Sequence, residues 1–432
     1  MDGNPNDVEL LLSSARQEIA SLEGDPRFKP FDGKRGEALR DHVLDLIGAA
    51  EHRLALDPGT GAPPSVSQSF SRTLRESILM LRAAHAAMPW LAATRSPSVN
   101  LGSLYATEEC AEILVGKEVD LVVVPDVEFM YSTISWPFLP VTNDTPGFTP
   151  RTTRRPIILH YPLSDGDRLL LHPLFAHELG HAAAQQFALV DKVNSALAED
   201  SEFVGALTKA VELMKGTWTV SEVKVTGTIL AWLRDWIEEL LCDQMAVEVM
   251  GPAYLWAFAG FVLPLGYHDK HPAYPPVTVR IRLMLDLLLA RGWQPYMEEA
   301  APHISSWLIE VGEDAEQPLS QPYEFLRQQI LNASDLLRDT VAAQVGGGTL
   351  SPVTAVEEAR EASTLLKSLI LPVGESYPLE PRSIMLGGWQ EAVRAHEDRP
   401  EGLVAALSDR RLQDLVGKAM EMSVVSSSWR KP

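Results

Sequence analysis

The sequence predicts a mainly α-helical protein that contains one small β-sheet, and two patterns lead to this prediction. Over most of the chain, apolar residues recur three and four positions apart, as at Leu74, Ile78 and Leu81. After residue 98 the pattern changes, and short β-branched runs of strand length follow one another. No repeat of fixed period and no low-complexity tract is found in the sequence.

The first hundred residues are predicted to be helical. Apolar residues follow helical spacing over residues 7–22, 34–56 and 66–88. A segment rich in Pro and Gly, residues 57–64, separates the second helix from the third. Pro89 is expected to end the third helix, since proline disfavours the helical conformation of the residue before it.

The middle of the chain combines strands with helices. Strands are predicted at residues 120–125, 129–136 and 156–160, with a long loop over residues 140–155. Further helices are predicted from Pro173 to about residue 189, over residues 226–249, which Gly251-Pro252 should end, and over residues 253–265. The rest is largely helical. We therefore expect an N-terminal helical region, a core and a C-terminal helical region at residues 1–97, 98–292 and 293–432.

Composition and charge exclude several classes of partner. The net charge is −21, from 37 basic and 58 acidic residues, and such a field repels nucleic acid and anionic membrane surfaces. Cys110 and Cys242 are the two cysteines, too few for a disulfide framework in a chain of this length. The acidic N-terminus does not resemble a signal peptide, and the most apolar stretch, residues 253–266, is too short to span a bilayer. We expect a cytoplasmic protein without a membrane or nucleic-acid partner.

The segment His177-Glu178-Leu179-Gly180-His181 has the spacing of a metal site. A helix turns by about 100° per residue, so His177 and His181 lie on one face and can direct two imidazoles to one point. Glu178 is adjacent to the first histidine and can reach a water on the metal. This arrangement is typical of sites where zinc lowers the pKa of water and a glutamate takes its proton. The alternative is a helix with two ordinary histidines on one face.

A second helix offers the third ligand that a catalytic zinc requires. Glu239 and Asp243 are one turn apart on a helix whose neighbouring residues are mostly apolar. Carboxylates in such surroundings need cations. The pair resembles the gluzincin pattern, in which one helix supplies a glutamate ligand and a carboxylate one turn later holds a zinc-bound histidine by its other ring nitrogen. This resemblance assigns Glu239 to the metal and Asp243 to the histidine. Glu238 is the rival ligand, but it points about 100° away and has no carboxylate four residues later. The alternative is an acidic, solvated helix face.

The order of these residues resembles that of the gluzincins, the thermolysin-like class of zinc metallopeptidases. In this sequence His177, Glu178 and His181 come first, and Glu239 and Asp243 follow. The resemblance covers about a quarter of the chain. It implies a zincin-like core with Zn²⁺ as cofactor and a protein or peptide as substrate. It also implies that Glu178 acts first as general base and then as proton donor to the leaving amine.

Other residues near these segments have weaker patterns. His271-Pro272 before Arg280-Ile281 looks like an element that follows the zinc site in some membrane-associated zinc proteases. His271 is therefore a candidate to stabilise an oxyanion, as are Tyr267 and Tyr274. The alternative is that His271-Pro272 only shapes a loop.

Residues 156–163 are the candidate edge strand for an extended substrate, the alternative being an ordinary buried strand. His160 and His172 lack helical spacing to the pair and are expected to be structural, and Cys242 is expected to pack in the core.

Three other functions stay open. The chain can be a zinc hydrolase of a non-peptide amide, which differs only in its substrate pocket. It can be a non-catalytic helical interaction protein whose metal is a structural clip with four protein ligands. It can also be a latent protease of a regulatory assembly, in which the helical flanks bind a regulatory partner.

Overall fold

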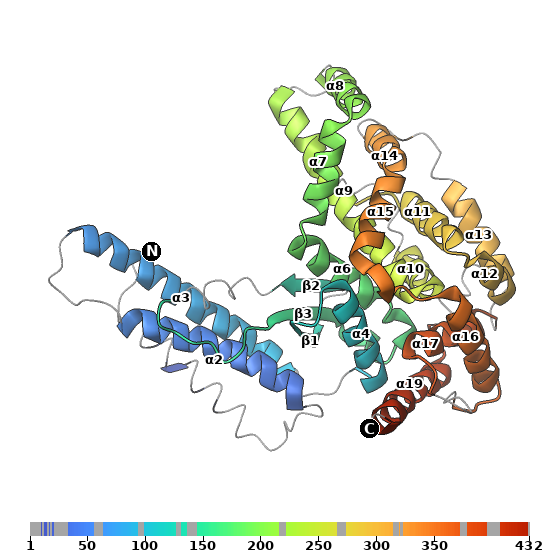
Figure 1. Cartoon of the computed structure of the whole chain (residues 1–432), viewed down its shortest axis with the longest axis horizontal. Coiled ribbons are helices and arrows are strands. Elements are labelled where there is room, and N and C mark those ends of the chain that lie inside the picture. The colour runs from blue at the N-terminus through green and yellow to red at the C-terminus, as the bar shows by residue number, and fades with distance from the viewer. Residues whose placement is uncertain are drawn as a thin grey trace. The chain divides into compact units, whose positions relative to one another are not determined.

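The computed structural model describes most of the chain. The described residues are 33–55, 64–93, 99–126, 131–135, 145–215, 222–265, 274–313, 319, 323–371, 378–394 and 407–430, with Leu10, Ser13, Ser14, Gln17 and Ala20. They are mainly helical with one three-stranded mixed sheet, which confirms the predicted fold class (Figure 1).

Contacts between residues divide the chain into two compact units. Unit 1 consists of Met1–Ser98 and Lys117–Leu163, and unit 2 consists of Val99–Gly116 and Ser164–Pro432. The strands thus group with the N-terminal helices, and the segment of the two histidines groups with the C-terminal helices. The units do not follow chain order, whereas the regions expected from the sequence (1–97, 98–292 and 293–432) do, so that division stays a prediction.

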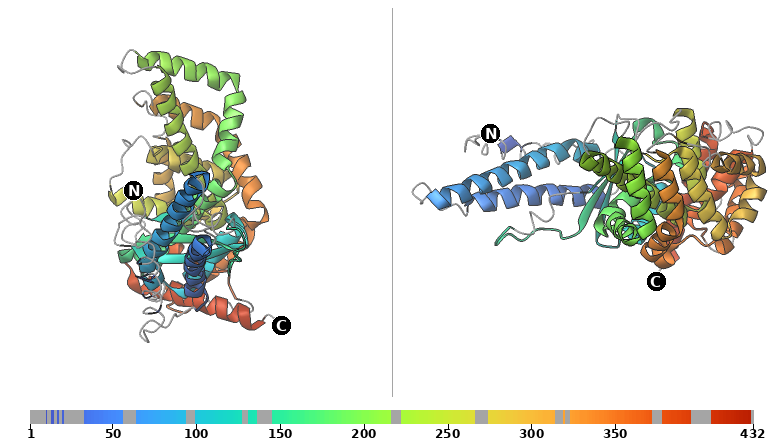
Figure 2. Two further views of the ribbon diagram at one scale, coloured as in Figure 1. Left: turned by 90° about the vertical axis from the view of Figure 1, so that its left-hand side faces the viewer. Right: turned by 90° about the horizontal axis from the view of Figure 1, so that it is seen from above.

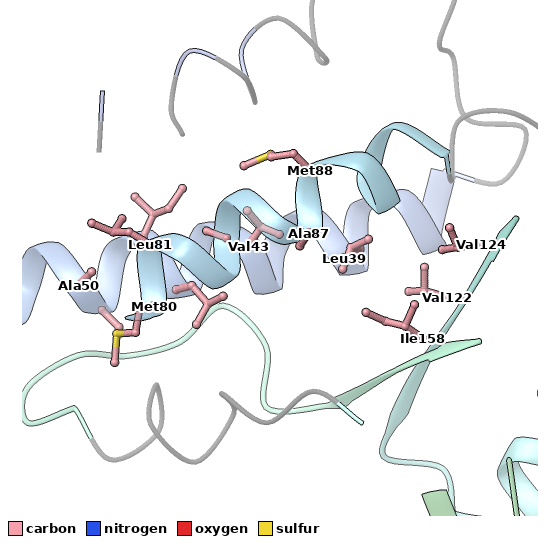
Figure 3. Packing of buried hydrophobic residues seen from close by; sticks show 14 residues of the cluster. Leu39, Val43, Ala50, Met80, Leu81, Ala87, Met88, Val122, Val124 and Ile158 are labelled. Carbon is pink, nitrogen blue, oxygen red and sulfur yellow. The ribbon is translucent and has the colours of Figure 1, made fainter. Parts of the chain in front are cut away.

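Unit 1 is built on two long helices, α2 (Gly33–Ala55) and α3 (Pro64–Ala93). They lie side by side in both views of the chain (Figures 1 and 2). Their apolar faces meet at Leu39, Val43 and Met88, which share one buried cluster with Val122 and Ile158 of the sheet (Figure 3). The helices therefore cover one face of the sheet, as their helical spacing of apolar residues predicts.

The sheet consists of β1 (Val119–Asp126), β2 (Ser132–Ser135) and β3 (Arg155–Pro162), in the order β1-β3-β2. β3 is parallel to β1 and antiparallel to β2. The prediction that residues 156–163 form an edge strand is therefore wrong. β2 pairs with residues 157–160 on the second side of β3, so β3 is the central strand of the sheet and not an edge to which a peptide adds. The alternative of an ordinary buried strand holds, and Ile157, Ile158 and Leu159 are fully buried.

Pro89 does not end its helix, and that prediction is also wrong. α3 continues through Pro89 to Ala93. The proline removes one backbone hydrogen bond near the end of the helix, where few turns depend on it. The residues on either side remain packed, since Met88 is buried and the ring of Trp90 meets that of His160 edge-on, 5.3 Å between centroids.

In its described residues, unit 2 consists of helices joined by turns and loops, without a β-strand (Figure 1). Its α-helices are α4 (Leu101–Leu114), α6 (Leu174–Gln186), α7 (Leu189–Glu199), α8 (Ser201–Lys215), α9 (Glu222–Met250), α10 (Pro252–Leu265), α11 (Val277–Ala290), α12 (Gln294–Ala300), α13 (Pro302–Glu313), α14 (Tyr323–Asn332), α15 (Ser334–Val345), α16 (Pro352–Lys367), α17 (Pro381–Arg394) and α19 (Arg410–Arg430). Short 3₁₀ turns are η2 (Leu163–Asp165), whose first residue belongs to unit 1, η3 (Leu169–Leu171) and η5 (Gly346–Gly348).

Helix α9 is central to unit 2. Over its 29 residues it contacts α6, α7, α8, α10, α11, α14 and α15. It ends at the predicted Gly251-Pro252 stop, where Gly251 has a φ of 58° that favours glycine. The next helix, α10, is the apolar segment expected from the sequence, and its residues 252–260 are buried. No helix in the described part of the chain is long and apolar enough to cross a membrane.

Candidate metal centre

Helices α6 and α9 approach closely at Gly180. A Cβ atom built on Gly180 would lie 2.9 Å from the Cα atom of Cys242, closer than real side chains come. The absence of a side chain on Gly180 therefore lets the backbone of α9 approach the histidine face of α6. Cys242 packs at this contact and is fully buried. Burial and the surrounding carboxylates raise the pKa of its thiol well above the usual value, so it remains protonated and packs as a core residue.

Three donor side chains converge where the two helices meet. Nε2 of His177 is 3.5 Å from Oε2 of Glu239, and Nε2 of His181 is 3.6 Å from Oε1 of the same carboxylate. Donor atoms of the three residues all lie within 4.8 Å of one another. Ligands about 2.0–2.1 Å from a tetrahedral zinc are roughly 3.3–3.5 Å apart, so both the donor types and their spacing fit this ion.

Each imidazole is also held through Nδ1, the ring nitrogen on the side away from Glu239. Nδ1 of His177 is 3.0 Å from Oδ1 of Asp243, and Nδ1 of His181 is 2.9 Å from Oε1 of Glu238. If a metal bound at Nε2, these contacts would hold the remaining imidazole proton on Nδ1. Asp243 thus occupies the position that the sequence assigned to it. Glu238, considered there as a rival metal ligand, instead contacts the second histidine.

Two further residues, Arg280 and Tyr254, donate hydrogen bonds to Asp243. Arg280 of α11 donates to it from Nε and from Nη2, both at 2.7 Å, and its Nη1 lies 3.2 Å from Oε2 of Glu239. Tyr254 of α10 donates its hydroxyl to Asp243 and lies 3.1 Å from Nδ1 of His177. Sequence reasoning missed Tyr254 entirely. It noted Arg280 only as part of the His-Pro…Arg-Ile element.

The site has a negative electrostatic character that suits a cation. Burial alone lowers the pKa of His177, but hydrogen bonds to Asp243 and Glu239 outweigh it and raise this pKa to about 10. Burial raises the pKa of Glu239, but the charge of Arg280 and its contact with His177 outweigh burial and lower it to about 2. Asp243 is likewise held below its usual pKa, against burial, by Arg280. The carboxylates are therefore ionised at neutral pH, and without a metal His177 is protonated there, so a metal at Nε2 has to displace a proton.

The remaining predicted residues are distributed as follows. Glu178 is buried on α6 beside His177, and its charge contributes to the raised pKa of Cys242. Tyr274 is 45% exposed. His271 and Tyr267 lie outside the described residues.

His172 and His160, expected to be structural, do not belong to the His177–His181–Glu239 group. His172 lies 2.5 Å from the hydroxyl of Ser103, and burial lowers its pKa to about 4. His160 lies on β3, in unit 1, with Nδ1 3.2 Å from Oδ2 of Asp126.

Comparisons of the chain with protein-family models, with curated proteins and with solved structures found no match in any of the three. The resemblance to the gluzincins therefore stays a prediction, which depends on the motif and on the geometry described above.

The close approach at Gly180 leads to a test. Gly180→Ala should lower the free energy of unfolding by about 1–3 kcal/mol, because the new methyl group overlaps the backbone of Cys242. It should also weaken zinc binding, because the histidines move away from Glu239. Denaturant unfolding and zinc titration measure the two effects.

Gly227→Ala on α9 is the matched control. No described atom lies within 4 Å of a Cβ at that position, so alanine should stabilise the helix by about 1 kcal/mol. Unchanged stability and zinc affinity in Gly180→Ala would show that the close approach of α6 and α9 is not required.

Proposed function

We propose that this chain is a zinc-dependent hydrolase of the gluzincin type, and that its substrate is a protein or peptide. The observation that supports this most is the convergence of His177, His181 and Glu239, with each histidine held at Nδ1 by a carboxylate. A chance pair of histidines on a helix has no reason to be backed by two carboxylates from one neighbouring helix.

In this proposal His177, His181 and Glu239 hold the metal. When bound, zinc acts as a Lewis acid that polarises a carbonyl oxygen and lowers the pKa of water from about 15.7 to about 7. The carboxylate of Glu178 accepts a proton from the attacking water as the water oxygen bonds to the carbonyl carbon. Glu178 then donates that proton to the amine nitrogen as the C–N bond breaks, so the base is restored. Asp243 and Glu238 keep both imidazoles oriented throughout.

The number of donors favours a hydrolase over a structural clip. Structural zinc sites are usually closed by four protein ligands, whereas catalytic sites have three and leave one position for water or substrate. Among the residues that the structure describes, the group has three members. A fourth protein ligand would support the alternative of a non-catalytic interaction protein.

Substrate and partner assignments remain part of the proposal. The net charge of −21 is unfavourable for nucleic acid and for anionic membranes, which leaves a protein or peptide in the cytoplasm as the expected substrate. The zinc hydrolase of a non-peptide amide shares the same metal chemistry and differs in the pocket. The helical regions outside the metal helices are the candidate surface for a regulatory partner. His271 remains a candidate oxyanion donor.

Metal removal tests the proposed function. The full chain should carry one zinc per molecule, and stripping it with a chelator should abolish cleavage of an unbiased peptide library. Adding zinc back should restore cleavage at the same bonds. Cleavage of a panel of non-peptide amides, with none of the peptides, would favour the second hydrolase class. Stoichiometric zinc without hydrolysis of either library would favour the structural clip, and failure to bind zinc would contradict the site itself.

A further inference from the structure

A single guanidinium bridges the two carboxylates that α9 directs into the centre. Arg280 uses Nε and Nη2 for a two-pronged pair with Asp243, and its Nη1 lies 3.2 Å from Oε2 of Glu239. The Arg280 side chain is 11% exposed, and it lies over the ring of Phe258 at 4.6 Å. A buried charge in this position is held by both of its partners.

The contact distinguishes the two oxygens of Glu239. Oε2 lies 3.2 Å from Nη1 of Arg280 and 3.5 Å from Nε2 of His177, whereas Oε1 lies 3.6 Å from Nε2 of His181. Arg280 and Glu239 form an ion pair, and Oε2 is the carboxylate oxygen given for it. An oxygen paired with a guanidinium is less available to a metal, because the two cations compete for it. The carboxylate is therefore polarised, with one oxygen directed to the arginine and the other available to a cation.

We infer that Arg280 is a positioning residue that restricts Glu239 to binding the metal through one oxygen. The inference rests on the proposed zinc site. If both oxygens of Glu239 bound the ion together with water, the coordination number would rise to five, and the second oxygen would crowd the position that water or substrate needs in a site with three protein ligands. By retaining one oxygen, Arg280 keeps that position open. The same guanidinium fixes Asp243, so the orientations of Glu239 and His177 are set by one side chain.

Only arginine suits this task. Its planar fork presents several donors in fixed directions, so it can serve Asp243 and Glu239 at the same time. A lysine at position 280 keeps the charge but offers a single ammonium on a flexible stem. We therefore expect Arg280→Lys to behave like Arg280→Gln at the metal, although it should be the more stable of the two.

A second arginine provides the matched control. Arg291, at the other end of α11, donates to Glu248, which is buried on α9, from Nε at 2.8 Å. This pair joins the same two helices and does not include a metal ligand. Arg291→Gln should thus reproduce the loss of an α9–α11 ion pair without changing the metal centre.

The experiment replaces zinc by Co²⁺ in the full-length protein, because the visible absorption of Co²⁺ weakens as its coordination number rises above four. The wild type and Arg291→Gln should give intense four-coordinate bands. Arg280→Gln and Arg280→Lys should give weaker bands, and their zinc dissociation constants, measured by chelator competition, should rise by about 10–100-fold.

Two results would overturn the inference. One is an Arg280→Gln or Arg280→Lys spectrum that is the same as the wild-type spectrum. The other needs no variant: weak bands of higher coordination in the wild-type protein itself. Neither result requires hydrolysis. If the protein binds Co²⁺ and its spectrum does not depend on Arg280, this inference alone is refuted. A protein that does not bind the ion refutes the proposed function as well.

Discussion

Glu178→Gln should abolish hydrolysis while one zinc per chain stays bound. The amide keeps the size of the carboxylate but cannot accept a proton from water, and general base catalysis of this kind contributes about 10²–10⁴ to the rate. Glu178 is not among the three grouped donors, so the metal should be retained. Metal analysis and cleavage of a library peptide, carried out on the same preparation, measure both properties.

His181→Ala is the contrasting variant. It removes a donor that lies 3.6 Å from Glu239 and should lose both zinc and hydrolysis. The two variants together separate metal binding from proton transfer. A Glu178→Gln protein that cleaved its substrate at the wild-type rate would contradict the assignment of Glu178 as the base, even if the zinc site were correct.

Asp243→Ala should produce a large loss of stability. Asp243 is 1% exposed and accepts two hydrogen bonds from Arg280, one from Tyr254 and one from His177. Removing one partner of a buried ion pair costs about 3–5 kcal/mol, because the other charge is left without compensation. Zinc affinity should also fall by about 10–100-fold, because His177 loses the carboxylate that orients it.

Urea unfolding of the metal-free protein measures the stability, and Asp286→Ala is the control. Asp286 pairs with Arg282 on α11, and both side chains are more than a third exposed. Loss of such a surface pair should cost at most about 0.5 kcal/mol. A cost for Asp243→Ala that is no larger than this would contradict a compensated, buried ion pair in the centre.

The sequence was sufficient for the parts of the site that depend on spacing within one helix. His181 follows His177 by four residues, and Asp243 follows Glu239 by the same spacing. Helical geometry alone puts the two members of each pair on one face of their helix. The predicted helix stop at Gly251-Pro252 has the same local origin. These predictions required no knowledge of how helices pack.

What the sequence missed depends on contacts between distant segments. Tyr254 belongs to a helix that looked only apolar, and its role follows from the position of α10 beside Asp243. Glu238 was judged by its angle to Glu239, whereas its role is set by where His181 of α6 lies. One signal was available in the sequence: if two histidines bind zinc, each needs a partner for its Nδ1, and Asp243 can serve only one of them.

The sheet shows the same limit. The three predicted runs overlap the strands β1, β2 and β3, but the order of the strands in the sheet depends on which strands pair. The short β2 occupies the side of β3 that a substrate was expected to use. Pro89 was predicted to end its helix from local preference, but the helix continues, with Met88 buried before it and Trp90 packed against the core after it.

Anomalous diffraction from crystals of the zinc-loaded protein tests the central claim most directly. The account predicts a single zinc peak about 2 Å from Nε2 of His177, from Nε2 of His181 and from a carboxylate oxygen of Glu239. A zinc ion on the two histidines with Glu239 more than about 4 Å away, or with a fourth protein side chain closing its coordination, would contradict it.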